Sequence, residues 1–501
     1  MNIAHLLDRW ADADPAKTAL RVADDEVSYA GLNLWSSGVA SRLAAAGVVT
    51  GDRVGVLAGS NAEFVAAIYG IWKLGAVAVF LNPQLAREDL ERQVAVAGAG
   101  VIVVDGDSAR WAVASSIGRD TGGIRLVRAG GGAAEPVPAV RLGPYDIACI
   151  AYTSGTTGLA KGAAHTHGAI LTQMEMVGAH YSATSEDEIL SLLPLFLFSI
   201  FLAGPALALS LGASCRVVPR YDALDVVRAI EKDGTTIVAA VPLFFYDLRE
   251  LVNEHGTDFD LSSLRVVTSG GAPLPESIRD ALEGRFGLRL VQLYGMTEAP
   301  GVVTGDPMTG ERRAGSVGRA LPHIRIVVED ADGRELPSGA IGEICTSAVR
   351  DGPFQGRYTT LARYWEMPEE TAEALRNGRF HTGDIGYLDD EGFLYLVDRK
   401  KDIIIRGGMN VYPREIEFLL AADGRVAECA VAGAPHPRYG EVPVAYVRLH
   451  EGARAAAEEL LDTVNERLAA SQRLEAVRFV RDFPRNSLGK ILKRQLRGRG
   501  T

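Results

Sequence analysis

A loop rich in hydroxyls and glycines, with one lysine, has the residue types that bind polyphosphate. It spans 152–162 and reads Tyr-Thr-Ser-Gly-Thr-Thr-Gly-Leu-Ala-Lys-Gly. Glycine lets a backbone approach an anion closely, the hydroxyls supply donors, and lysine adds a positive charge. The apolar run 146–152 predicts a short buried strand that ends where this loop begins. Lysine precedes glycine here and no hydroxyl follows, so this is not a Walker A motif. Taken alone, a flexible connector remains an alternative.

Three further motifs carry residues that could do chemistry. The segment 292–298 (Gln-Leu-Tyr-Gly-Met-Thr-Glu) follows an apolar strand, Thr382-Gly383-Asp384 comes next, and 484–490 (Pro-Arg-Asn-Ser-Leu-Gly-Lys) is the last. Each has an ordinary structural alternative: a tyrosine at a core edge, a carboxylate at a helix N-terminus, an aspartate in a turn, a lysine in a basic tail. One at a time, those alternatives are favoured.

Short β-branched runs alternating with amphipathic stretches must position these motifs, up to about residue 397. This alternation predicts a large α/β unit with a mainly parallel sheet, whose strand ends bind ligands. After residue 313, short strands punctuated by glycine predict a smaller, more antiparallel region. The predicted strands include 53–57, 101–104, 236–240, 265–268, 324–328, 342–345, 393–397 and 403–405.

A charged break at 398–402 marks the predicted domain boundary. We expect an N-terminal domain of residues 1–398 and a small C-terminal α+β domain of residues 399–501, with helices near 413–421 and 455–468. The predicted fold class is therefore α/β, with a large N-terminal domain of several subdomains and a smaller second domain.

Composition limits the kinds of partner and the cellular compartment that we expect. The length of 501 residues exceeds what one core usually serves, and the net charge of −11 argues against general nucleic-acid binding. Four cysteines without CxxC spacing predict reduced core thiols in a cytoplasmic protein, without disulfides or a zinc site. The apolar stretch 189–211 contains Pro194 and Pro205, so we expect core segments and no transmembrane helix. No signal peptide is predicted, and the oligomeric state stays open.

In this order and combination, the motifs resemble those of the adenylate-forming acyl-CoA synthetases, a superfamily that includes firefly luciferases and the adenylation domains of nonribosomal peptide synthetases. The resemblance runs from Val27-Ser28-Tyr29-Ala30 to Lys490, with Asp398-Arg399 between the third and fourth motifs. It implies ATP, Mg²⁺ and CoA and a two-step reaction. A carboxylate attacks the α-phosphorus of ATP, giving an acyl-adenylate and pyrophosphate, and a thiol then displaces AMP to give a thioester.

The resemblance also implies roles for single residues. Lys490 would bridge the carboxylate and the α-phosphate, Thr297 would contact the α-phosphate, and Glu298 would help to place Mg²⁺, which needs oxygen ligands. Cations are required because two unit charges about 4 Å apart repel by roughly 4 kcal/mol at an effective dielectric near 20. The implied nucleotide-binding residues are Thr153, Ser154, Gly155, Thr156, Thr157, Gly158 and Lys161 at the β- and γ-phosphates, Gly270, Gly271, Ala272, Gln292, Tyr294, Gly295 and Met296 near adenine, and Asp384 and Arg399 at the ribose.

For the second step, the resemblance implies a mobile C-terminal domain. This domain rotates in the family, withdrawing the lysine of the first step and presenting a glycine-rich face to the pantetheine thiol. Lys401 occupies the hinge position, and Gly407 and Gly408 would flank the thiol tunnel. The thiol belongs to CoA or, alternatively, to a separate phosphopantetheinyl carrier protein. A scaffold protein with a degenerate synthetase fold is a third alternative, against which the presence of all the charged motif residues argues.

The predicted acid pocket departs from the common family pattern. Many relatives have Pro-x-Phe-His, whereas Leu197 replaces the histidine here. Residues 194–204 contain no aspartate, arginine or lysine, which argues against amino acids and dicarboxylates because a buried charge needs a partner. We therefore expect an apolar aliphatic or aromatic monocarboxylic acid, and we expect Arg216 and Arg220 at the surface. Expected lining residues, each with a core position as the alternative, are Phe196, Leu197, Phe198, Phe244, Phe245 and Leu293.

Replacing Lys490 with alanine should abolish adenylate formation, because the bridging charge is lost. Thioester formation from supplied acyl-adenylate should stay largely intact, because another arrangement of the C-terminal domain performs it. Pyrophosphate release measures the first half-reaction, and CoA consumption measures the second. Equal loss of both would contradict the role of Lys490.

Overall fold

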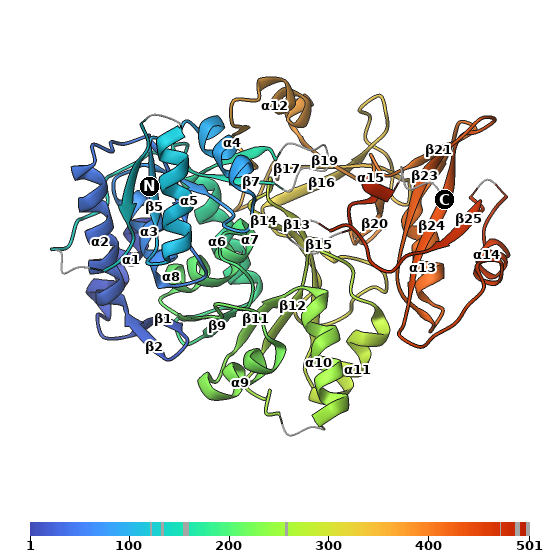
Figure 1. The fold of residues 1–501 in the computed structure, drawn as a ribbon, viewed down its shortest axis with the longest axis horizontal. Coiled ribbons are helices and arrows are strands. Elements are labelled where there is room, and N and C mark those ends of the chain that lie inside the picture. The colour runs from blue at the N-terminus through green and yellow to red at the C-terminus, as the bar shows by residue number, and fades with distance from the viewer. Residues whose placement is uncertain are drawn as a thin grey trace. The chain divides into compact units, whose positions relative to one another are not determined.

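The computed structural model describes all residues except 121–122, 132–134, 154–159, 256–258, 471, 486–490 and 497–501. The described residues divide into two compact units. Unit 1 comprises 1–153, 160–325 and 347–378, and unit 2 comprises the described residues of 326–346 and 379–501. Figure 1 shows the elements of both units along the chain.

The first sheet of unit 1 has seven strands, in the order β18-β8-β7-β4-β3-β5-β6. Its central strands are parallel and buried on both faces, which explains their unbroken apolar runs. Helices α4 and α5 pack on one face, and α3 contacts β3 and β4. The strands are β3 (Arg53–Leu57), β4 (Val77–Phe80), β5 (Val101–Val104), β6 (Arg125–Arg128), β7 (Ile147–Tyr152), β8 (Gly162–Thr166) and β18 (Arg363–Tyr364); the helices are α1 (Ala4–Ala13), α2 (Tyr29–Ala45), α3 (Ala62–Lys73), α4 (Arg87–Ala97) and α5 (Ser108–Asp120).

The second sheet of unit 1 has nine strands, in the order β15-β14-β13-β12-β11-β9-β10-β1-β2. Its parallel centre shares an apolar core with α9, α10 and α11, the green helices beside β11 and β12 in Figure 1. The strands are β1 (Thr18–Val22), β2 (Asp25–Ser28), β9 (Glu188–Ser191), β10 (Ser214–Val217), β11 (Ile237–Ala240), β12 (Val266–Ser269), β13 (Leu290–Met296), β14 (Gly301–Gly305) and β15 (Arg319–Ala320); the helices are α6 (His167–His180), α7 (Phe198–Phe201), α8 (Leu207–Leu211), α9 (Ala223–Asp233), α10 (Pro242–His255), α11 (Glu276–Phe286) and α12 (Pro368–Ala374).

Local sequence signals set the ends of several of these helices. The Asn61 side chain accepts a hydrogen bond from the Phe64 amide at the start of α3, and Asp222 does the same for two amides of α9. Gly234 and Gly287 follow α9 and α11 in the left-handed conformation that glycine adopts without strain. Short polar residues and glycines therefore place the turns that join strands to helices.

Unit 2 contains two sheets. One is the four-stranded sheet β16-β17-β19-β20, apart from the ends of β16 and β17, which belong to unit 1. The other has the order β22-β21-β24-β23 with β25 beside β24, and α13 and α14 share its apolar core. The elements are β16 (Ile324–Glu329), β17 (Gly342–Ala348), β19 (Phe380–Leu388), β20 (Leu394–Arg399), β21 (Ile404–Arg406), β22 (Met409–Val411), β23 (Val426–His436), β24 (Gly440–Leu449), β25 (Ala476–Phe479), α13 (Pro413–Ala421), α14 (Ala457–Asn465) and α15 (Lys493–Leu496).

The predicted α/β class is confirmed, with antiparallel pairing in the region after residue 313 as expected. The charged break is shorter than predicted, because Asp398 and Arg399 belong to β20 and pair with β19. The boundary at residue 398 stays a prediction. None of the four cysteines forms a disulfide. Within the described ranges, no helix is long and apolar enough to cross a membrane, and 189–211 divides into β9 and short helical segments.

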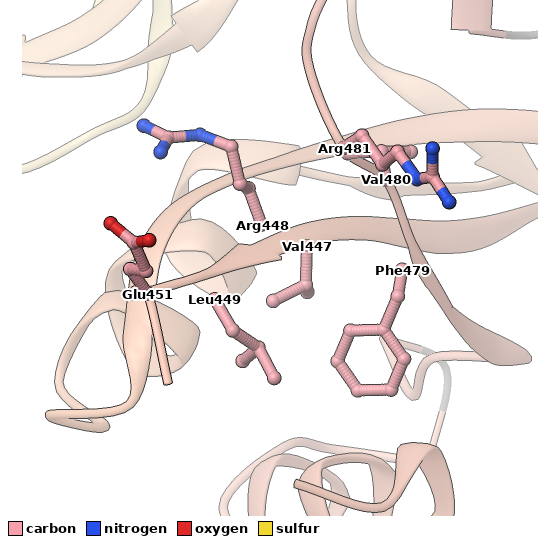
Figure 2. Close-up of a pocket in the computed structure, with 7 residues that line it drawn as sticks. All are labelled: Val447, Arg448, Leu449, Glu451, Phe479, Val480 and Arg481. Atoms are coloured by element: carbon pink, nitrogen blue, oxygen red, sulfur yellow. The ribbon is translucent and has the colours of Figure 1, made fainter. Parts of the chain in front are cut away.

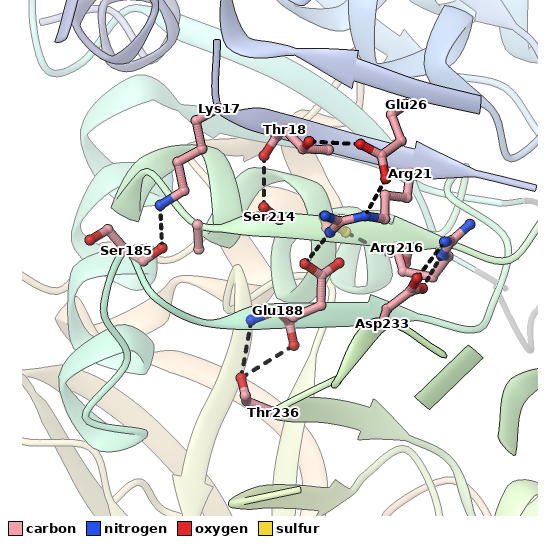
Figure 3. A network of polar contacts seen from close by, with 12 residues as sticks. Lys17, Thr18, Arg21, Glu26, Ser185, Glu188, Ser214, Arg216, Asp233 and Thr236 are labelled. Carbon is pink, nitrogen blue, oxygen red and sulfur yellow. Dashed lines mark hydrogen bonds and ion pairs between the residues drawn. The ribbon is translucent and has the colours of Figure 1, made fainter. Parts of the chain in front are cut away.

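An ion network crosses β9, β10, β1 and β2, the last four strands in the order of the nine-stranded sheet (Figure 3). Arg21 pairs with Glu26 and Glu188, and Arg216 pairs with Asp233 through two nitrogens, Nη2 lying 2.8 Å from Oδ1. The expected surface position of Arg216 is wrong, because only 7% of it is exposed. Its guanidinium can be buried because Asp233 supplies the opposite charge. Arg220 is exposed, as expected.

Replacing Asp233 with asparagine should destabilise unit 1 by about 3 kcal/mol, because a buried guanidinium loses its counter-charge. Urea denaturation compares this variant with Lys232→Gln, which removes a neighbouring ion pair to Asp24 that is largely exposed. The Lys232 variant should lose less than about 1 kcal/mol. Equal losses of unfolding free energy would show that burial does not decide how much the Arg216–Asp233 pair contributes to stability.

Candidate functional site

The predicted phosphate loop connects β7 to β8 in unit 1. Ser154, Gly155, Thr156, Thr157 and Gly158 lie outside the described residues. The two ends of the loop are held together, since the Thr153 amide donates to the Lys161 carbonyl over 2.9 Å and Tyr152 pairs with Gly162. The loop is thus the connection of an antiparallel hairpin at the end of a parallel strand.

Lys161 and Glu298 both contact Tyr364, a residue that the sequence analysis missed. The Tyr364 hydroxyl donates to Glu298 Oε1 over 3.0 Å, and Lys161 Nζ lies 5.0 Å from the centre of the Tyr364 ring. Tyr364 lies on β18, which pairs with β8. Two motifs about 140 residues apart in sequence therefore meet at one tyrosine. Its only local signal is an aromatic residue in a short polar segment, which does not reveal a partner at Glu298.

A close backbone approach shapes the turn that carries Thr297 and Glu298. β13 and β14 pair with a register shift between Tyr294 and Gly295. A Cβ on Gly295 would lie 1.8 Å from the Gly301 carbonyl oxygen, so only glycine fits there. This contact closes the hairpin and sets the positions of the two residues that follow Met296.

The residues predicted near adenine lie at the neighbouring carboxyl ends of β12 and β13. Gln292 Nε2 donates to the Ala272 carbonyl over 3.4 Å, and the Gly270 amide donates to the Ala240 carbonyl over 3.0 Å. Gly271 has a φ of +81°, which an L-side chain rarely adopts. Tyr294 and Leu293 are 7% and 8% exposed, so both side chains are buried on β13.

The predicted acid segment is anchored to the loop after β3. The Leu195 amide donates to Ser60 Oγ over 3.1 Å. The same loop is held by Asp105, which accepts from the Gly59 amide, from Asn61 and from Arg110. Burial disfavours the Asp105 carboxylate, yet these hydrogen bonds hold its pKa below the usual value.

The predicted pocket residues divide between two places in unit 1. Phe198 is buried, packs edge-on against Phe80 and stacks on His165, with ring centres 4.9 Å apart. Phe196 is also buried, and Leu197 is half-buried. Phe244 and Phe245 pack inside the core of the nine-stranded sheet, which favours the core alternative for both.

His165 is a second residue that sequence reasoning missed. It lies on β8, is fully buried and stacks on Phe198. Burial lowers its pKa to about 3, although a hydrogen bond to the Thr297 main chain favours the protonated ring and raises the pKa. The ring is therefore neutral at physiological pH. His165 follows small residues and precedes Thr166 and His167, a local pattern that does not reveal its contact with Phe198.

In unit 2, the structure pairs Asp384 with Arg399. The two residues face each other across β19 and β20, and Arg399 Nε lies 2.5 Å from Asp384 Oδ1. Thr382 Oγ1 accepts from the Asp384 amide over 3.0 Å, and Gly383 turns with a φ of +70°. Asp384 is only 4% exposed. This arrangement presents an oriented carboxylate beside a guanidinium.

The remaining predicted residues of unit 2 follow β20. Lys401 comes two residues after the strand end, and Gly407 and Gly408 form the turn between β21 and β22 with positive φ. The Gly407 amide donates to the Tyr439 carbonyl over 2.7 Å. Lys490 lies outside the described residues.

Unit 2 also has a pocket beside β24 and β25, which the sequence analysis did not predict. Figure 2 shows Val447, Leu449 and Phe479 as its apolar part, with Arg448 and Arg481 pointing away from them. The residues that line it include none of the predicted site residues. The predicted site residues of unit 2, among them the Asp384–Arg399 pair, therefore lie elsewhere in this unit.

Replacing Gly295 with alanine should push β13 and β14 apart, because the added methyl overlaps a carbonyl oxygen. Overpacking of this kind costs about 1–3 kcal/mol, so the thermal unfolding midpoint should fall and adenylation should fall with it. Gly284→Ala is the matched control, because nothing lies within 4 Å of the added Cβ on α11. A normal midpoint for the Gly295 variant would contradict the packing argument.

Comparisons with known proteins identify the family of this chain. Residues 7–353 match the AMP-binding enzyme family, and residues 415–490 match the AMP-binding enzyme C-terminal domain. The chain is 34% identical over 496 residues to a feruloyl-CoA synthase of an Amycolatopsis species, with 98% of this chain and 97% of that protein covered. It is 33% identical over 516 residues to a long-chain-fatty-acid–CoA ligase of Mycobacterium tuberculosis, with 99% and 98% covered.

A solved structure gives the same result. The o-succinylbenzoate CoA synthetase MenE of Bacillus subtilis, in complex with ATP and a magnesium ion, has a TM-score of 0.85 and 30% identity, with 98% of each chain covered. The predicted use of ATP, Mg²⁺ and CoA is confirmed at the level of this family. The chain therefore belongs to the AMP-binding enzyme family, within the adenylate-forming superfamily, and is an AMP-forming acid–CoA ligase.

Proposed function

We propose that this ligase activates an apolar monocarboxylic acid, aliphatic or aromatic, and transfers the acyl group to CoA. The observation that carries the proposal is the character of segment 194–204, which has no charged residue and in which Phe198 packs against Phe80 and His165. A charged group on the acid would lack a partner in that segment. Feruloyl-CoA synthase and long-chain-fatty-acid–CoA ligase name one aromatic and one aliphatic monocarboxylate, which supports the same class.

In the proposed first step, an acid oxygen forms a bond to the α-phosphorus of ATP while the bond to pyrophosphate breaks. In this proposal Lys490 bridges the two anions and stabilises the charge that moves to the leaving group. Thr297 contacts the α-phosphate, and the loop from Thr153 to Lys161 holds the β- and γ-phosphates. The adenine lies against Tyr294 and the Gly270–Ala272 segment, and Asp384, oriented by Arg399, accepts from the ribose hydroxyls.

The residues present fit a magnesium ion. Glu298 offers the carboxylate oxygens that a hard cation prefers, and Tyr364 already fixes the position of one of them. Mg²⁺, when bound, neutralises phosphate charge. Glu298 is the residue that we assign to hold it.

In the proposed second step, the C-terminal domain turns at Lys401, and Gly407 and Gly408 let the pantetheine arm approach. Both glycines have a positive φ, a backbone conformation that residues with a side chain rarely adopt, and neither adds a side chain to the turn. The sulfur bonds to the acyl carbon while the bond to AMP breaks. The N-terminal domain of residues 1–398 and the mobile domain of residues 399–501 remain our division of the chain.

A phosphopantetheinyl carrier protein instead of CoA is the alternative acceptor.

Leu197 stands where many relatives have histidine, so in this proposal the carboxylate end of the acid has apolar neighbours. The buried His165 stacks on the Phe198 ring. A neutral imidazole there adds no charge to the pocket, which agrees with an uncharged acyl group.

A panel of acids with ATP and CoA tests the proposal, with pyrophosphate release and acyl-CoA mass as readouts. Octanoate, cinnamate and ferulate should give kcat/KM values at least about 100-fold above those of alanine and malonate, because the pocket offers no partner for a second charge. A preference for malonate would refute the apolar pocket. Pyrophosphate release with acyl transfer only to a carrier protein would favour the alternative acceptor, and no release with any acid of the panel would refute the proposed substrate class.

A further inference from the structure

One tyrosine links the lysine of the phosphate loop to the carboxylate of the Thr297-Glu298 turn. The Tyr364 hydroxyl donates to Glu298 Oε1 over 3.0 Å, and its ring face lies 5.0 Å from Lys161 Nζ. Only 7% of Tyr364 is exposed, so the contacts lie inside unit 1. A single side chain thus contacts both the Glu298 carboxylate and the Lys161 ammonium.

The main chain around Tyr364 is fastened on both sides of these contacts. The Leu361 amide donates to the Glu298 carbonyl over 2.7 Å, and the Trp365 amide donates to the Gly162 carbonyl over 2.7 Å. The segment 361–365 is therefore tied to the Glu298 turn at one end and to the residue after Lys161 at the other. Tyr364 cannot shift without moving one of the two.

The chemistry of the two contacts suits different tasks. A phenol that donates to a carboxylate makes a charge-assisted hydrogen bond, which fixes one oxygen and leaves the other to face a cation. Carboxylates that bind metals are oriented by such hydrogen bonds, and losing them costs 10- to 100-fold in metal affinity. A ring face attracts an ammonium within about 6 Å, so the ring restrains Lys161 without neutralising it.

We propose that Tyr364 is a positioning residue of the adenylating site. Its hydroxyl orients the Glu298 carboxylate for the magnesium ion that accompanies ATP, and its ring holds the Lys161 ammonium toward the β- and γ-phosphates. This inference rests on the proposed roles of Glu298 and Lys161, and it adds a residue from β18 to a site otherwise built from strand ends.

Calorimetric titration with a non-hydrolysable ATP analogue, with and without Mg²⁺, tests the hydroxyl. Tyr364→Phe keeps the ring, so affinity without Mg²⁺ should not change, whereas affinity with Mg²⁺ should fall about tenfold. Glu298→Gln should show the same Mg²⁺-specific loss. Because Tyr364 acts through Glu298, the double variant should lose no more than Glu298→Gln alone.

Two further variants separate the ring from the hydroxyl and from general damage. Tyr364→Leu also removes the ring, so the analogue should bind more weakly with and without Mg²⁺. Tyr358→Phe makes the same change at another buried tyrosine, which packs against His323, and should alter neither affinity. Thermal unfolding midpoints confirm that each variant is folded.

Three results would overturn the inference: an unchanged Mg²⁺-dependent affinity in Tyr364→Phe, an equal loss with and without Mg²⁺, or additive losses in the double variant. The titration needs no acid and no turnover. An acid panel without products would therefore refute the proposed substrate class while leaving the role of Tyr364 open to this measurement.

Discussion

Electrostatic repulsion between a carboxylate and a polyphosphate is the constraint on which the rest of this structure depends. The chain has a net charge of −11, so its overall charge does not attract anions. Positive charge must instead be placed at single positions, each held by its surroundings. The ring of Tyr364 beside Lys161 and the Asp384–Arg399 pair are two such placements, and each is set by strand pairing.

Strand pairing brings the motifs of unit 1 together. The phosphate loop follows β7 of the seven-stranded sheet, whereas Gly270 and the Thr297-Glu298 turn follow β12 and β13 of the nine-stranded sheet. All three begin at the carboxyl ends of strands with a parallel neighbour, where α/β sheets bind ligands. The approach of Gly295 to Gly301 then sets the turn after β13. The short strand β18, from a distant part of the chain, pairs with β8 of the seven-stranded sheet and brings Tyr364 to Glu298. Site geometry thus follows from backbone hydrogen bonding before any ligand is present.

The predicted acid segment is held in place by polar contacts from a neighbouring loop. Ser60 fixes the Leu195 amide, and Asp105 fixes the loop that carries Ser60. Phe198 is packed between Phe80 and a neutral His165. These buried contacts fix the backbone of the segment, and its apolar character is the basis for the class of acid that we propose.

The sequence by itself determined the elements and the motifs. Strands 53–57 and 101–104 and the helix at 413–421 follow from local apolar patterns, and the order of four motifs was enough to recognise the superfamily. Local patterns carry this information because helix and strand periods depend on neighbouring residues. Tertiary structure alone decided which distant residues meet. Arg216 was expected at the surface but is buried and paired with Asp233. Tyr364 donates a hydrogen bond to Glu298, 66 residues away in sequence. No local pattern encodes such a partner, because the contact exists only when separate strands pair.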